Sequence, residues 1–422
     1  MSPVQSLAFW SQSVTIGDNS GDNTCGRDWL EHSPGHSPVK PVLLTARVGI
    51  AIVVGTALGN LSGNIMPLLL PGYESRFALT STALGVIAAA QLVTLAVMAL
   101  CLSGRIGGLS RTKVATVGLG VTAAGYLATG LASSAGWLGA ASVVTGLGLG
   151  AVFAASSAAM AATTNHDRTA SIAVVGSTIV IAAIMVAVPL VQDLGGPLAA
   201  YAILATICLL AIPFMRALPG AATSSGGMAP ATRLSAWFIG GVVLLAITDQ
   251  GAWSYAGLLA KDHRVLNDIQ ATFLLSIAAL TALAGVPAAT FLARRFGRRA
   301  AVIAVLLTEA AAKSVLPIAG VALFVGSALV WQMAYLGVLV LMLAVAADRD
   351  PSGRWVAAAG GALAIGAGLG PAAVGWLLDV VGTPGLSVAL AAVTALAAVP
   401  LTIVAAGTPP RRGIDNATEE MR

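Results

Sequence analysis

Residues 81–102 have the sequence STALGVIAAAQLVTLAVMALCL, a run of more than twenty residues without a charged side chain. A helix of about 20 apolar residues is long enough to cross the ~30 Å hydrocarbon core of a bilayer. A transmembrane barrel strand needs only about 10 residues and alternates apolar with polar side chains. Because residues 81–102 show no such alternation, they predict a transmembrane helix rather than a strand.

Similar apolar runs, separated by short polar segments, fill the chain from residue 42 to residue 406. We therefore expect an all-α integral membrane protein with twelve transmembrane helices. The predicted spans are 42–68, 81–102, 114–132, 136–161, 170–191, 198–214, 234–259, 269–292, 300–316, 320–347, 355–381 and 385–406.

The composition of the whole chain agrees with a membrane protein. Apolar residues make up 57% of its 422 residues and charged residues only 9%, whereas a typical soluble domain is about 25% charged. This balance excludes a soluble enzyme, and it also excludes a disordered chain, which needs low hydrophobicity and high charge. The Lys and Arg residues are not gathered into a basic arm, so we expect a lipid bilayer as the surroundings and no nucleic-acid partner.

The sequence lacks the residue sets of metal, cofactor and ATP sites. The Cys residues have no C-x-x-C spacing, the His residues all lie in polar stretches, and none of the four Lys follows a Gly, as a Walker A motif requires. We expect no metal, no cofactor and no catalytic residues. The residues concerned are Cys25, Cys101, Cys208, His32, His36, His166 and His263.

Polar segments divide the chain, and two features recur across the division. Gly196-Pro197 lies 187 residues before Thr383-Pro384, and the basic cluster at Arg111 lies about as far before the one at Arg298. A shared offset indicates an internal repeat. The predicted organisation is a disordered cytoplasmic tail (1–41), a six-helix half (42–214), a cytoplasmic linker (215–233), a second six-helix half (234–406) and a cytoplasmic tail (407–422).

The basic residues also predict the orientation. Lys and Arg are enriched in cytoplasmic loops. If the N-terminus is cytoplasmic, seventeen of the 22 Lys and Arg residues lie on the inside and three on the outside. We expect a multi-pass protein of the cell (inner) membrane with both termini in the cytoplasm.

Two sequence motifs resemble those of a known family. Leu292–Arg299, LARRFGRR, is similar to the end of the turn G-x-L-A-D-R-x-G-R-K, and Gly104–Lys113 is a weaker copy with Gly108 at the position of the acid. Gly366–Gly375, GAGLGPAAVG, is similar to G-x-x-x-G-P-x-x-G-G. Over about residues 42–406, the chain thus resembles the major facilitator superfamily.

This resemblance implies two pseudo-symmetric halves that hold a substrate near the membrane midplane and expose it to each side in turn. It implies a secondary active transporter of a small organic solute, not an enzyme, with protons as the coupling ion by family habit and a monomer as the working unit. The gating residues it implies are Arg105, Arg111, Lys113, Arg295, Gly297, Arg298, Arg299, Gly370 and Pro371.

Four charged residues lie well inside the predicted spans: Arg47, Asp249, Glu309 and Lys313. A charged side chain at the bilayer centre costs about 2.5–3.5 kcal/mol on insertion scales, so each needs an explanation. We expect Asp249 to be a cation partner or proton carrier. Glu309 and Lys313 are spaced i,i+4, which suits either a structural ion pair or a pair that titrates with the coupling ion.

Polar and aromatic residues of the predicted spans are candidates for contact with a substrate, because ligand pockets combine apolar walls with a few polar groups. Packing between helices is the alternative interpretation for all of them. The candidates are Asn60, Asn64, Gln91, Gln250, Trp253, Trp331, Gln332 and Tyr335.

The direction of transport stays open at this point. A drug or metabolite efflux antiporter of the same fold is one alternative to uptake. An integral-membrane enzyme or a receptor is an alternative of a different class.

Overall fold

The described part of the chain is helical, apart from one isolated bridge between Val42 and Thr163. The predicted tails, Gly108 and most of the predicted linker lie outside it. The computed structural model describes residues 42–103, 105–106, 109–220, 233–262, 266–350 and 354–406.

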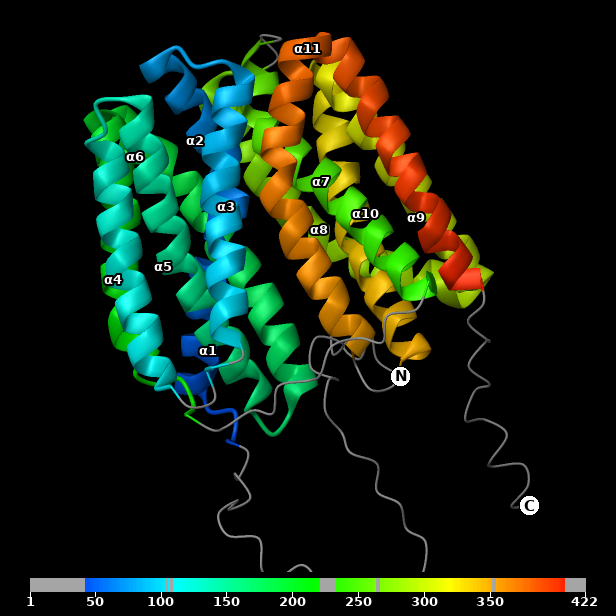
Figure 1. The fold of residues 1–422 in the computed structure, drawn as a ribbon, viewed down its shortest axis with the longest axis horizontal. Coiled ribbons are helices and arrows are strands. Elements are labelled where there is room, and N and C mark those ends of the chain that lie inside the picture. The colour runs from blue at the N-terminus through cyan, green and yellow to red at the C-terminus, as the bar shows by residue number, and fades with distance from the viewer. Residues whose placement is uncertain are drawn as a thin grey trace, which may run out of the picture. The chain divides into compact units, whose positions relative to one another are not determined.

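Eleven α-helices follow one another in these ranges (Figure 1). Within the described residues, eight helices are long and apolar enough to cross a membrane, and the pair α1 and α2, bent by 41°, makes a ninth. The predicted helical membrane fold is therefore confirmed. The helices are α1 (Ala46–Gly59), α2 (Leu61–Phe77), α3 (Ser81–Ser103), α4 (Arg111–Gly130), α5 (Ala135–Ala161), α6 (His166–Met215), α7 (Arg233–Asp262), α8 (Asp268–Phe296), α9 (Arg298–Val315), α10 (Val321–Arg349) and α11 (Arg354–Ala406).

Two of these helices, α6 and α11, are each broken once by a glycine. Gly196 has φ 75° and Gly382 has φ 65°, a region that glycine adopts without the penalty of other residues. A proline follows each glycine within two residues. Both breaks fall between neighbouring spans of the sequence prediction, 170–191 and 198–214 in α6 and 355–381 and 385–406 in α11.

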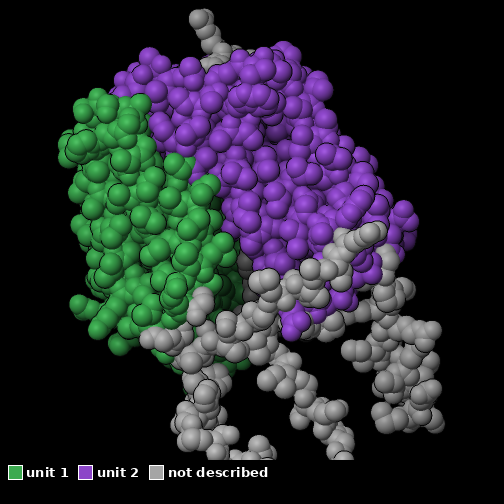
Figure 2. All heavy atoms as spheres, viewed as in Figure 1, with its two compact units in different colours: residues 1–65, 90–227 green, residues 66–89, 228–422 purple. Residues whose placement is uncertain are grey.

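The helices form two compact units, coloured separately in Figure 2. Unit 1 comprises residues 1–65 and 90–227, and unit 2 comprises 66–89 and 228–422. The second unit thus includes residues 66–89, which cover most of α2 and the start of α3.

In unit 1, α4 packs against α5 and α6, and α1 packs against the same two helices. Glycines bring the backbones close together. A Cβ atom at Gly118 would lie 2.8 Å from the carbonyl oxygen of Gly148, and one at Gly146 would lie 2.2 Å from that of Gln91. Small residues of this kind allow helix backbones in membranes to touch.

In unit 2, α7 packs along α11, and α10 packs against α8 and α9. The same principle applies here, because a Cβ at Gly370 would lie 2.6 Å from the carbonyl oxygen of Ile247. Side chains from α7, α9 and α10 meet inside this unit and bring its buried charged residues together.

Candidate functional site

A buried ionic cluster lies where α7, α9 and α10 meet. The Lys313 ammonium donates hydrogen bonds to Asp249 Oδ1 at 2.6 Å, to Glu309 Oε1 at 2.9 Å and to Thr248 Oγ1 at 2.9 Å. The side chains of Lys313 and Glu309 are 0% exposed and that of Asp249 is 6% exposed. All three charges are therefore removed from water.

The sequence anticipated one part of this cluster and missed another. The i,i+4 spacing predicts the contact between Glu309 and Lys313, and the structure contains it. Asp249 comes from a different helix, 64 residues from Lys313, and no pattern in the sequence pairs the two. Nor does any pattern single out Thr248.

The cluster has one more carboxylate than ammonium groups. Glu309 Oε2 is buried and accepts no hydrogen bond from the described residues. Asp249 Oδ1 and Glu309 Oε1 both accept a hydrogen bond from the same Lys313 ammonium, at 2.6 and 2.9 Å, so the two carboxyl groups lie close together. Because burying an unpaired charge is costly, this site is suited to bind one proton between the two carboxyl groups.

One tryptophan binds Asp249, and a second packs against the first. Trp331 donates its indole N–H to Asp249 Oδ1 at 3.2 Å, and its ring lies edge-on to that of Trp253 with centroids 6.1 Å apart. Two sequence candidates for substrate contact are thus adjacent to the predicted proton carrier. The geometry is typical of a favourable aromatic pair.

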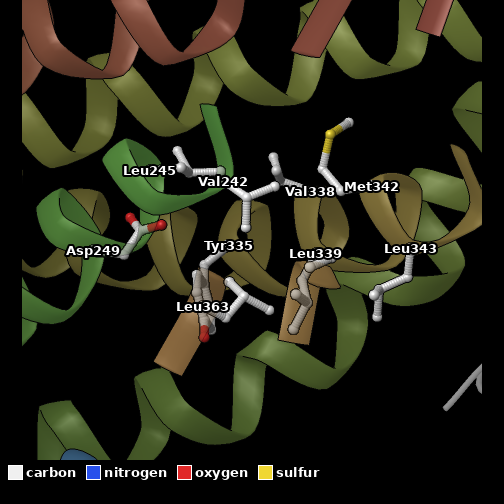
Figure 3. A pocket seen from close by; sticks show the side chains of 10 residues that line it. Val242, Leu245, Asp249, Tyr335, Val338, Leu339, Met342, Leu343 and Leu363 are labelled. Atoms are coloured by element: carbon white, nitrogen blue, oxygen red, sulfur yellow. The ribbon is translucent and has the colours of Figure 1, made fainter. Parts of the chain in front are cut away.

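A small pocket opens beside Asp249 and Tyr335, one turn beyond Trp331 on α10 (Figure 3). Its volume of about 20 Å³ is enough for roughly one water molecule. Apolar side chains form most of its wall, and the side chains of Asp249 and Tyr335 supply its polar groups. The lining residues are Val242, Leu245, Asp249, Tyr335, Val338, Leu339, Met342, Leu343, Ala359 and Leu363.

The amide candidates on α1 to α3 belong to unit 1. Asn60 and Asn64 donate to the carbonyl oxygens of Thr56 and Asn60, both at 2.9 Å, so these amides support the bend between α1 and α2. Gln91 is buried and donates to Ser62 Oγ at 2.8 Å.

The remaining amide candidates belong to unit 2. Gln250 donates to Ser254 Oγ at 3.5 Å, one turn further along α7. Gln332 is buried on α10 next to Trp331.

Four predicted gating residues of the second half, Arg295, Gly297, Arg298 and Arg299, lie around the start of α9. Gly297 has φ 85° and separates α8 from α9. Arg298 forms an ion pair with Asp348 at the end of α10, and the Arg295 guanidinium lies 5.4 Å from the ring centroid of Phe296. Arg299 is exposed.

In the first half, Arg111 is buried and donates to the carbonyl oxygen of Pro219 at 2.8 Å. Arg105 donates to the carbonyl oxygen of Cys101 at 3.3 Å, and Lys113 is exposed.

Pro371, on α11, directly follows the close approach of Gly370 to α7, and its carbonyl oxygen would lie 2.3 Å from a Cβ at Gly85.

Among the described residues, no group of three or more His, Cys, Asp or Glu side chains is arranged to hold a metal ion. Cys25, His32, His36 and His263 lie outside those residues.

Comparison with known proteins gives a match in structure. No family model and no curated protein sequence matches the chain. Among solved structures, a point mutant of the nucleoside transporter NupG matches with a TM-score of 0.64 at 13% identity, covering 85% of this chain and 99% of that one. A bacterial homologue of the human lysosomal transporter Spinster, inward-facing and occupied, matches with a TM-score of 0.65 at 16% identity, covering 88% and 96%.

The unoccupied, inward-facing structure of the same Spinster homologue matches with a TM-score of 0.63 at 14% identity, covering 85% and 95%. These matches show the fold alone, which the chain shares with these solved membrane transporters. More particularly, the chain has the fold of the major facilitator superfamily, as its motifs predicted.

Proposed function

We propose that this chain is a secondary active transporter, not an enzyme, which moves a small organic solute by alternating access and couples its movement to protons. The observation that carries the proposal is the surplus carboxylate in the buried Asp249–Glu309–Lys313 cluster, set in a transporter fold. Buried ionisable groups in membrane proteins commonly mark proton and substrate paths.

The proposed topology has twelve spans in two halves, 42–214 and 234–406, joined by the linker 215–233. The bent pair α1 and α2 forms one span, and α6 and α11 form two each, divided at Gly196 and Gly382. The distribution of basic residues supports cytoplasmic termini in an inner membrane. We propose that the monomer is the working unit.

In the proposed mechanism, one proton binds between Asp249 and Glu309, and Lys313 stays charged as the fixed counter-ion. With the proton bound, the cluster carries no net charge, which favours movement through the low-dielectric interior. Without it, the net negative charge favours a state in which water or a cationic group reaches Asp249. The pocket beside Asp249 and Tyr335 supports access of this kind.

We propose that Trp253, Trp331, Gln332 and Tyr335, with Gln250, form the substrate surface of the second half, and that Asn60, Asn64 and Gln91 form that of the first. Aromatic faces and amides suit a solute with planar or apolar parts and a few polar groups. Both uptake and efflux fit this arrangement.

Reconstituted vesicles test the proposal. Purified protein in proteoliposomes, with a pH-sensitive dye inside, is exposed to a panel of solutes that includes nucleosides and lipophilic amines. We expect at least one solute to move protons, and we expect Asp249→Asn to abolish that movement. The matched control Asp193→Asn changes an exposed acid of α6 and should leave it intact. Full proton movement by Asp249→Asn would remove Asp249 from the mechanism.

A further inference from the structure

The first turn of α3 is held by a side chain from α11. Asp379 accepts hydrogen bonds from the backbone N–H of Ser81 through Oδ1 at 3.1 Å and of Thr82 through Oδ2 at 2.7 Å. Nearly 300 residues separate the partners in the chain. The carboxylate therefore serves as an additional N-terminal cap, which comes from a distant helix.

This external cap completes an otherwise incomplete helix start. The first N–H groups of a helix lack partners within the helix, and Asp, Ser, Thr or Asn next to them normally accepts their hydrogen bonds. Thr80 Oγ1 accepts from Ala83 N at 3.3 Å, as a local N-cap. Asp379 provides the acceptors for the two preceding N–H groups, and its negative charge is favourable at the positive end of the helix dipole.

The equivalent helix of the second half caps itself. The repeat offset of 186 residues relates Ser81 to Asn267, and Asn267 is the N-cap of α8, where it forms a capping box with Gln270. Both helix starts have a local cap, Thr80 at α3 and Asn267 at α8. They differ because α3 also binds a carboxylate from a distant helix.

Further contacts hold the same turn against α7 and α11. The Tyr255 hydroxyl donates to the carbonyl oxygen of Ser81 at 2.5 Å. A Cβ at Gly375 would lie 2.3 Å from that oxygen, and a Cβ at Gly257 would lie 2.0 Å from the carbonyl oxygen of Pro67. The backbones therefore meet closely, and the fit leaves no space for larger residues.

We propose that Asp379 and Tyr255 form a latch that holds the hairpin 66–89 of the proposed first half on α7 and α11 of the proposed second half, and that this latch opens and closes during transport. The proposal rests on the proposed transport function. It agrees with the assignment of 66–89 to unit 2, although the chain joins this hairpin to α1 and the rest of α3.

The repeat provides a matched control for this latch. Asp193 lies 186 residues before Asp379, three residues before Gly196, as Asp379 lies three before Gly382. Both acids are exposed. Replacement of either removes one exposed carboxylate at the same position of the repeat, but only Asp379 caps α3.

The test measures how often the latch opens, without any substrate. Leu84, one turn into α3, is buried, so we expect a cysteine there to react with a maleimide when the hairpin separates. In full-length Leu84→Cys protein in proteoliposomes, with Cys25 and Cys101 replaced by Ser, we expect Asp379→Ala to raise the alkylation rate roughly fivefold, the effect of losing an exposed charge-assisted hydrogen bond.

Tyr255→Phe, which keeps the ring, should raise the rate by a smaller factor, and Asp193→Ala should leave it unchanged. Unchanged rates in both Asp379→Ala and Tyr255→Phe would overturn the latch, as would an equal rise in Asp193→Ala. Proton movement measured on the same vesicles separates the two proposals. If protons still move while the alkylation rates are unchanged, the latch is overturned and the proposed transport function stands.

Discussion

The ammonium group of Lys313 on α9 lies 2.6 Å from Asp249 Oδ1 on α7 and 2.9 Å from Glu309 Oε1 one turn away on its own helix. One buried cation therefore serves two buried carboxyl groups. The local pair Glu309–Lys313 alone would be neutral, and Asp249 makes the cluster a site with a net charge that one proton cancels.

Removal of the cation should harm the fold far more than removal of the surplus acid. Lys313→Met leaves two buried carboxylates without a counter-ion, and we expect it to lower the free energy of unfolding by about 3–5 kcal/mol. Glu309→Gln leaves the Asp249–Lys313 pair intact, and we expect a loss of about 1 kcal/mol. Thermal unfolding in detergent compares the two. Equal losses would contradict the shared-cation arrangement.

Glu309→Gln should also uncouple transport from the proton gradient. The variant keeps the neutral Asp249–Lys313 pair but lacks one of the two carboxyl groups that share the proton. We expect solute exchange at equal pH to persist and gradient-driven accumulation to fall at least tenfold. The neighbour Thr308 is exposed and its hydroxyl bonds to Ala304 in its own helix, so Thr308→Ala is the control. Undiminished accumulation by Glu309→Gln would assign the acid a structural role.

The indole N–H of Trp331 should orient Asp249. Trp331→Phe keeps an aromatic ring near Trp253 but removes the hydrogen bond to Asp249 Oδ1. A hydrogen bond to a charged group contributes about 1.5–3 kcal/mol, so we expect a loss of stability of that size and a shifted pH profile of transport. Trp237→Phe, at an exposed position of α7, should change neither. A pH profile like that of the unmodified protein would argue against a link between Trp331 and the proton site.

Close packing of α7 on α11 should depend on Gly370. An added Cβ would lie 2.6 Å from the carbonyl oxygen of Ile247, and overpacking of this kind costs about 1–3 kcal/mol. We expect Gly370→Ala to lower the unfolding temperature. Gly360→Ala, on the same helix, adds its methyl group to open space and should be neutral or slightly stabilising. Equal unfolding temperatures for the two variants would contradict the contact.

Sequence patterns were sufficient for the local parts of this protein. Run length and composition predicted the helical membrane fold, and Gly196 and Gly382 break α6 and α11 where the spans were predicted to end. Because a charged side chain in hydrocarbon is costly, Asp249, Glu309 and Lys313 stand out in the sequence as residues with a special role. Asp379 gave no such signal, because a carboxylate near the end of a span is solvated and ordinary in sequence.

By itself, the sequence determined that the chain is a helical membrane protein and which few ionisable groups lie inside it, because both follow from length, composition and the cost of leaving water. Only the tertiary structure decided that Lys313 meets Asp249 across 64 residues and that Asp379 meets Ser81 across 298. Such contacts depend on how glycine-lined helices pack against one another, and packing between helices has no period that a single sequence displays.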